Sequence, residues 1–460
     1  MAATLVQREF PGGGACFAPP AETSMTGFVL DEQGDWFEPD LSVVRRLVQP
    51  GWKIVDVGAG YGCYGLSLAA HGVAEVTLVE PHPAMGEALA RGASLSAARA
   101  TIHRCAAGPA GHGLLTDPRD PEMARLSEDG AHEVDVRPVD SMVGDPASVD
   151  YLKVDVEGDL HAALASGSRI LAGDRAVVQM PIRLSGQHQG RSCALLMESG
   201  RTLHRVLPGL GVLVPLLPGE GADAFQLNIL AIPAGRRDEL RERGVVLGVI
   251  DELSPLPEGI KVQGVIDRLA AEPWAKTLCG AWAPNAILPG WDQQRRAVAM
   301  QRLAEDPDLA IADRAACLHQ ALAASRRALA AGMTGSRLVT AIRIMCAAGV
   351  RVEASRAAEA LQSIGQAKDA EIVASFAEPF LPPLREHEGF AAPALPDLAR
   401  CMAIEAGLFV PFFSAYFQGA TKLPAYERAT ALPLHSARSV RVAAILRRMN
   451  QRQAPMALRL

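Results

Sequence analysis

The stretch Val55-Asp56-Val57-Gly58-Ala59-Gly60-Tyr61-Gly62 decides the fold class of this 460-residue chain. Residues 53–57 form a short apolar run typical of a buried parallel strand, and residues 63–71 have the pattern of the helix that follows it. Glycines between a strand and a helix let the backbone turn tightly and approach a ligand without Cβ clashes. The pattern predicts a βαβ unit whose turn holds a nucleotide-like cofactor at the start of the helix.

A carboxylate after the second strand supports this interpretation. Residues 76–79 form another apolar run that ends in Glu80, where a carboxylate can accept hydrogen bonds from ribose hydroxyls. Gly60, Gly62 and Gly65 also fit a dinucleotide pattern, so an NAD-dependent oxidoreductase is one alternative. Asp56 counts against it, because a carboxylate just before the glycines would repel a pyrophosphate. A purely structural glycine turn is the remaining alternative.

Composition indicates the general class of protein. A hydrophobic content of 49% with 21% charged residues is typical of a globular protein, and the length predicts two domains. The net charge of −6 gives no basic field for nucleic acid. The eight cysteines include no C-x-x-C pair, which predicts reduced thiols and no metal site. With no signal-peptide pattern and no long apolar run, a cytoplasmic protein without a transmembrane segment is expected.

Residues 1–250 are predicted to form one α/β domain, of which residues 1–48 are a lead-in. Short apolar runs alternate with helical stretches, which favours a Rossmann-like doubly wound sheet. Residues 108–132 are rich in glycine, proline and acids and are predicted to form a long loop. Further strands are expected over residues 101–107, 134–137, 151–155, 176–180 and 225–232.

An all-α helical C-terminal domain is predicted for residues 295–460, after a linker over residues 251–294 that includes the proline-rich segment 254–259. Leucines recur there at helical spacing, as at Leu318 and Leu322, and glycines such as Gly349 fall where helices would end. Short connections favour antiparallel helical hairpins.

The last predicted helix is amphipathic and basic, with an apolar stripe at Val442, Ile445 and Leu446. Such a helix can rest on a membrane surface or a protein partner, or it can pack on its own bundle. We favour packing on the bundle.

Several segments, taken together and in order, resemble the FkbM family of S-adenosylmethionine (SAM)-dependent methyltransferases. The resemblance covers about residues 30–245. It is carried by Asp35-Trp36-Phe37-Glu38-Pro39-Asp40, Pro50-Gly51, Asp56 to Gly65, Glu80-Pro81-His82-Pro83, the K-x-D-x-E-G core Lys153-Val154-Asp155-Val156-Glu157-Gly158, Leu207 to Gly211 and Gln226-Leu227-Asn228. It implies a class I methyltransferase fold that binds SAM and methylates a hydroxyl of a glycan or small molecule.

The resemblance also implies the cofactor site. Asp56 would lie near the methionine ammonium of SAM, Glu80 and Pro81 at the ribose, and Cys105 and Ala106 beside the adenine. The turn residues implied to hold the cofactor are Gly58, Ala59, Gly60, Tyr61 and Gly62.

The candidate catalytic residues belong to the K-x-D-x-E-G core. Methyl transfer is an in-line displacement, and a positioned carboxylate can take the proton of a hydroxyl acceptor. Asp155 and Glu157 are the candidates for base or substrate anchor. Alternatively one of them pairs with Lys153, which must be paired if its mid-strand position is buried. For Lys153 itself a structural salt bridge is favoured over a catalytic role.

The chain departs from the family at the fifth strand, where members commonly carry a glutamate. Residues 176–182 contain no acid, and Gln179 is the nearest polar group. The alternative function is therefore an inactive SAM-fold module whose helical half recruits a partner. In the lead-in, Trp36 could cap the pocket or simply pack, while Glu38 and Asp40 are expected on a solvated loop face.

Overall fold

The computed structural model describes residues 4–96, 98–116, 121–182, 187–217, 223–250, 254, 261–272, 275, 282, 288–382, 394–432 and 435–453. The chain divides into two compact units, which are described separately. The first comprises Met1–Val206, Gly211–Glu220 and Gln226–Val246, and the second Leu207–Leu210, Gly221–Phe225 and Leu247–Leu460.

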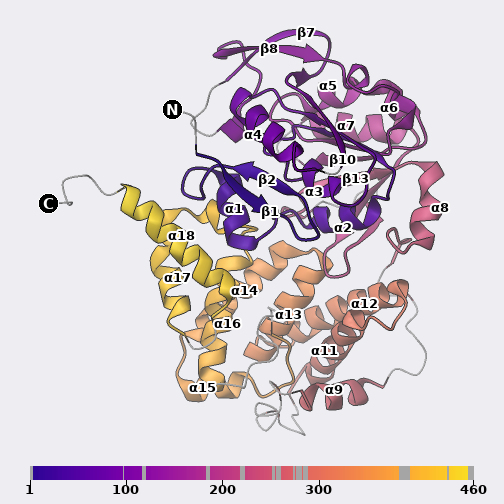
Figure 1. Cartoon of the computed structure of the whole chain (residues 1–460). Coiled ribbons are helices and arrows are strands. Elements are labelled where there is room, and N and C mark those ends of the chain that lie inside the picture. The colour runs from indigo at the N-terminus through magenta and orange to yellow at the C-terminus, as the bar shows by residue number, and fades with distance from the viewer. Residues whose placement is uncertain are drawn as a thin grey trace, which may run out of the picture. The chain divides into compact units, whose positions relative to one another are not determined.

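An eight-stranded sheet forms the centre of the first unit, in the order β12-β11-β13-β10-β9-β3-β4-β5. Two of its neighbouring strands, β10 and β13, are labelled in Figure 1. Its strands are β3 (Lys53–Val57), β4 (Glu75–Val79), β5 (Arg99–His103), β9 (Tyr151–Val154), β10 (Val177–Pro181), β11 (Thr202–Leu207), β12 (Val212–Pro215) and β13 (Asn228–Ile232). The neighbours from β10 to β5 are parallel, whereas β13 runs antiparallel between β10 and β11. The strand of this sheet that comes last in the sequence, β13, therefore lies between β10 and β11.

Both faces of this sheet are buried, because successive residues of its central strands belong to different hydrophobic clusters. On β3, Ile54 faces one cluster and Val55 the other. The first cluster takes in residues of α2 (Pro39–Leu47), α3 (Gly65–Ala69), α4 (Pro83–Ala93) and α8 (Ala234–Glu242); the second takes in residues of α5 (Leu160–Ala165), α6 (Ser168–Ala172) and α7 (Gln187–Glu198). The predicted doubly wound α/β sheet is confirmed, although the sequence interpretation missed β11 and β12.

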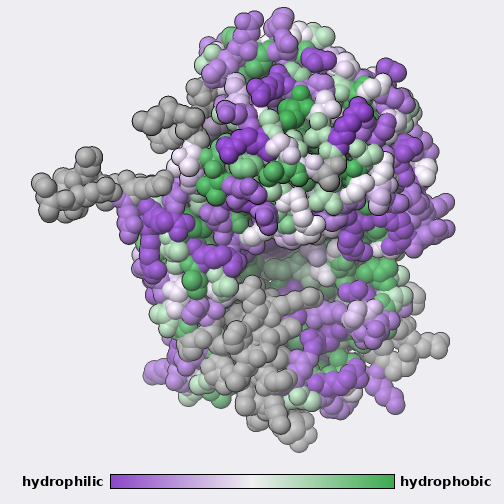
Figure 2. All heavy atoms as spheres, viewed as in Figure 1, coloured by the Kyte–Doolittle hydropathy of each residue, from purple (hydrophilic) through white to green (hydrophobic). Residues whose placement is uncertain are grey.

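Two small β structures flank the sheet. In the lead-in, β1 (Val6–Glu9) pairs antiparallel with β2 (Ala15–Ala18), and α1 (Met25–Gln33) follows. A separate three-stranded sheet consists of β6 (Ala106–Ala107), β8 (His132–Arg137) and β7 (Gly111–Leu115). The prediction of a continuous loop over residues 108–132 was therefore wrong, because β7 pairs with β8 across most of its length. Figure 2 shows hydrophilic residues over much of the outer surface of this unit.

The second unit is helical, as predicted. Its helices are α9 (Val262–Ala270), α11 (Trp291–Glu305), α12 (Ile311–Ala330), α13 (Gly335–Ala348), α14 (Arg351–Gly365), α15 (Asp369–Ser375), α16 (Leu395–Phe409), α17 (Leu423–Thr430) and α18 (Ala437–Gln453). Leu318 and Leu322 are buried, and Gly349 ends α13 with a left-handed φ of 78°. Helix α9 lies inside the segment predicted as a linker, whereas residues 255–259 of that segment lie outside the described residues.

The apolar stripe of α18 is buried at Val442, Ile445 and Leu446, Arg447 is exposed, and α18 packs against α17 of the same helical unit. Among the described residues, no helix has the length and apolarity needed to cross a membrane.

Candidate functional site

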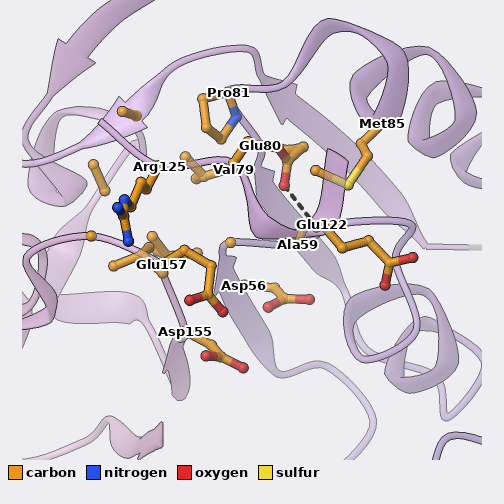
Figure 3. Close-up of a pocket in the computed structure, with 18 of the residues that line it drawn as sticks. Asp56, Ala59, Val79, Glu80, Pro81, Met85, Glu122, Arg125, Asp155 and Glu157 are labelled. Carbon is orange, nitrogen blue, oxygen red and sulfur yellow. Dashed lines mark hydrogen bonds between the residues drawn. The ribbon is translucent and has the colours of Figure 1, made fainter. Parts of the chain in front are cut away.

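The candidate site lies at the carboxyl ends of the parallel strands. Strand β3 pairs with β4 on one side and with β9 on the other. The chain adds β4 and β5 on one side of β3 and later adds β9 on the opposite side, so the direction of strand addition reverses between β3 and β9. Ligands of open α/β sheets bind in the crevice at such a switch point. A pocket of about 270 Å³ opens there, lined by residues that follow β3, β4, β5 and β9 (Figure 3).

The pocket brings together the predicted site residues, with one exception. Gly62 does not line it. The others do: Asp56, Gly58, Ala59, Gly60, Tyr61, Glu80, Pro81, Cys105, Ala106, Lys153, Asp155 and Glu157. Residues from the ends of four strands, β3, β4, β5 and β9, therefore share one cavity.

The glycine turn after β3 needs glycine at its first position. Gly58 has φ of 80°, and a Cβ there would lie 1.8 Å from the backbone oxygen of Asp155. The amides of Gly58 and Ala59 both donate to the Val79 carbonyl, at 2.9 and 3.0 Å. The turn is thus fixed against the end of β4.

Glu80 closes the other side of the turn. Its Oε2 accepts from the Gly60 amide at 2.9 Å, the bond marked in Figure 3, and its Oε1 accepts from the His82 amide at 2.8 Å. Burial raises the pKa of Glu80 to about 7, although these two hydrogen bonds lower it. Each oxygen keeps a second lone pair for a ligand hydroxyl.

Asp56 forms the floor of the pocket. Its Oδ2 accepts from the Gly65 amide at 2.9 Å, and its Oδ1 lies 4.0 Å from the Lys153 ammonium. Asp56 and Lys153 are also directly opposed in the register of β3 and β9. Burial raises the pKa of Asp56, whereas Lys153 and the Gly65 amide lower it.

Lys153 is buried and ion-paired, as the sequence favoured. Its ammonium lies 3.0 Å from Asp155 Oδ2 and 4.7 Å from the centre of the Tyr64 ring. Burial lowers the pKa of Lys153, but Asp155, Asp56 and Glu38 together raise it above the usual value. Lys153 therefore stays protonated and compensates carboxylates on several sides.

The two candidate carboxylates of the K-x-D-x-E-G core differ in setting. Asp155 is partly buried beside Lys153, whereas Glu157 is exposed. Figure 3 shows both side chains in the same part of the pocket as Asp56. Asp155 is thus held in place by an ion pair, and Glu157 lies at the rim.

The expectation that Glu38 and Asp40 lie on a solvated loop face was wrong, since both side chains are buried. Trp36 and Glu38 line the pocket, and the Trp36 indole N–H donates to Glu38 Oε1 at 2.8 Å. Asn228 on β13 donates to Glu38 Oε2 at 2.7 Å and to Asp40 Oδ2 at 3.1 Å. Sequence reasoning missed this because the partner lies 190 residues away.

Gln179 occupies the strand position where the sequence lacks an acid, and it does not line the pocket. Its Oε1 accepts from the Tyr151 hydroxyl, and its Nε2 donates to the Tyr64 hydroxyl at 2.9 Å. All three side chains are buried. The amide therefore links the buried Tyr151 to Tyr64, which itself lines the pocket.

Thr26 and Glu122 were not anticipated as site residues, yet both line the pocket. Glu122 accepts from the Thr26 amide at 3.1 Å and from the Thr26 hydroxyl at 2.6 Å. This pair connects α1 to the segment before β8, 96 residues further along the chain. No local sequence pattern signals such a contact.

The charged lining of the pocket is mostly acidic. Its acids are Glu38, Asp56, Glu80, Glu122, Asp155, Glu157 and Asp159, and its bases are Arg125 and Lys153. Within the described part of the chain, no three His, Cys, Asp or Glu side chains are grouped to hold a metal ion.

Comparisons with known proteins give no family. No family model matches this chain, and no curated protein matches it. Among solved structures it is similar to a precorrin-6y C5,15-methyltransferase from Geobacter metallireducens, with 11% identity and a TM-score of 0.26 over 42% of this chain and 87% of that one. It is also similar to a TehB-like SAM-dependent methyltransferase from Corynebacterium glutamicum, with 14% identity and a TM-score of 0.26 over 45% and 92%. Likeness this remote carries no argument about function, and the resemblance to the FkbM family stays a prediction.

Proposed function

We propose that this chain is a SAM-dependent methyltransferase that acts on a hydroxyl of a glycan or small molecule. The proposal rests on the hydrogen bonds that the backbone amides of the glycine turn donate. The amides of Gly58 and Ala59 bond to Val79, that of Gly60 to Glu80 and that of Gly65 to Asp56.

These bonds argue against a dinucleotide. A pyrophosphate in a Rossmann site is held by amides of the glycine turn and the following helix. Here those amides are engaged, and the Asp56 carboxylate would repel phosphates bound at the turn. The same arrangement suits a cationic ligand: Asp56 would attract the ammonium and sulfonium of SAM, and Glu80 would accept from its ribose hydroxyls.

SAM would supply an electrophilic methyl group. The chain's own contribution would be to orient the acceptor against that methyl and to receive its proton. Asp155, held by Lys153, would anchor an acceptor hydroxyl; the 3.0 Å ion pair between them supports this role.

Calorimetric titration tests the cofactor assignment. The purified full chain is titrated with SAM, with S-adenosylhomocysteine and with NAD. We expect binding of both sulfur ligands and none of NAD. Failure of both sulfur ligands to bind would overturn the proposal, whereas binding without label transfer from methyl-labelled SAM to any extract would favour a SAM-binding module.

A further inference from the structure

Glu38 is a pocket carboxylate that comes from outside the strand-end loops. It precedes α2 at the N-cap position, but its side chain makes no capping hydrogen bond to that helix. Instead the carboxylate turns inward, is 9% exposed and lines the pocket. A buried carboxylate that does not cap its own helix needs another explanation.

Neutral donors hold the Glu38 carboxylate on both sides. Trp36 donates to Oε1 at 2.8 Å, and Asn228 donates to Oε2 at 2.7 Å. These two bonds fix the plane of the carboxylate without neutralising its charge. Each oxygen still has a lone pair that can accept from a ligand.

Asp155 differs from Glu38 in this respect. Its Oδ2 accepts from the Lys153 ammonium at 3.0 Å, so this oxygen already has a charged donor. Burial raises the pKa of Glu38, Lys153 lowers it, and the charge of Asp155 raises it. A carboxylate with a raised pKa is better suited to general-base work near neutral pH.

We propose that Glu38 is the general base of methyl transfer and that Asp155, fixed by Lys153, positions the acceptor hydroxyl. This inference rests on the proposed methyltransferase function. The acceptor oxygen forms a bond to the methyl carbon while the carbon–sulfur bond breaks and its electron pair goes to sulfur. The hydroxyl proton passes to Glu38, which returns it to water after the methyl ether leaves.

Other titratable groups surround Glu38, and each can contribute to the pH dependence of the transfer rate. They are Lys153 and Tyr151 from β9, Asp155 from the loop after it, Asp40 from α2 and Tyr64 from the glycine turn. Of these carboxylates, Asp40 shares the Asn228 amide with Glu38 but does not line the pocket. Asp40→Asn is therefore the matched control.

The test measures label transfer from tritium-methyl SAM into a glycan and small-molecule extract of the source cells, with the full chain and its Glu38→Gln, Glu38→Asp and Asp40→Asn variants. S-adenosylhomocysteine affinity is measured for each variant as a check on folding. For Glu38→Gln we expect unchanged affinity, a loss of transfer of at least about 100-fold and loss of the rising limb of the pH–rate profile. Glu38→Asp should recover part of the rate, and Asp40→Asn should stay within about threefold of the original chain.

Two outcomes would overturn the inference in different ways. If the original chain transfers label and Glu38→Gln does so at a similar rate with the same pH profile, Glu38 is not the base. If the original chain neither binds the sulfur ligands nor transfers label, the methyltransferase function itself fails and the role of Glu38 fails with it.

Discussion

Lys153 lies directly opposite Asp56 in the register of β9 and β3, and its ammonium bridges toward Asp155 at 3.0 Å. One buried cation thus compensates carboxylates from two neighbouring strand ends. Lys153 therefore affects both the stability of the fold and the charge of the pocket.

Lys153→Met should lower the free energy of unfolding by about 3–5 kcal/mol, because it leaves buried carboxylates uncompensated. Urea unfolding followed by circular dichroism measures the change. Lys53→Met is the control, since Lys53 is 41% exposed and lies 3.5 Å from Glu75; it should change stability by less than about 1 kcal/mol. Equal effects of the two variants would contradict the assignment.

Ligand affinity should depend on the ionisation of Glu80. Its pKa of about 7 means that only part of the ligand-free protein carries the carboxylate at neutral pH. A ligand that donates to the charged form should bind about tenfold more tightly at pH 8 than at pH 6. Titration with S-adenosylhomocysteine measures this, and Glu80→Gln should weaken binding and remove the pH dependence. Persistence of the full pH dependence in Glu80→Gln would assign it to another group, such as Asp56.

Stability should depend on pH through Asp40. Burial, and then the charge of Glu38, raises the pKa of Asp40 to about 7 from an ordinary 3.8. Between these values the folded state holds a proton that the unfolded state has lost, so this group's contribution to stability falls as pH rises toward 7. Asp40→Asn should therefore stabilise the protein more at pH 8 than at pH 5, by a difference on the order of 2 kcal/mol. Thermal unfolding at both pH values tests this, with the 92% exposed Asp238 replaced by Asn as a pH-independent control.

Gln179→Met should destabilise the fold by about 2–4 kcal/mol, because it leaves the buried hydroxyls of Tyr64 and Tyr151 without the amide between them. Since Gln179 does not line the pocket, S-adenosylhomocysteine affinity should change by less than about twofold. Adding Tyr151→Phe should recover part of the lost stability in a double-mutant cycle. A large loss of affinity at unchanged stability would instead place Gln179 in the binding site.

Asp155→Asn and Glu157→Gln should have unequal effects on methyl transfer. Asp155 is fixed by Lys153 inside the pocket, so its loss should reduce label transfer by at least about tenfold with little change in cofactor affinity. Glu157 is exposed, and Glu157→Gln should reduce transfer by less than about threefold. Label incorporation from methyl-labelled SAM measures both, and a reversed order would make Glu157 the anchor.

The sequence by itself determined the α/β class, the helical second half and the strand ends that meet at the pocket. These features follow from local patterns: apolar runs define β3, β4 and β9, and glycines after β3 mark the turn. Because parallel strands present their carboxyl ends at one edge, residues that follow different strands come together without any knowledge of their contacts. Asp56, Glu80 and Asp155, which lie at the ends of these three strands, line one cavity.

Only the tertiary structure determined which residues form the inner wall of the site. Glu38 was expected on a solvated loop face, yet Asn228, 190 residues away, donates a hydrogen bond to its carboxylate in the pocket. Gln179 stands where an acid was expected, and the structure shows its side chain outside the pocket lining, hydrogen-bonded to Tyr151 and Tyr64. Burial and long-range hydrogen bonds depend on which elements pack together, and no periodicity along the chain encodes them.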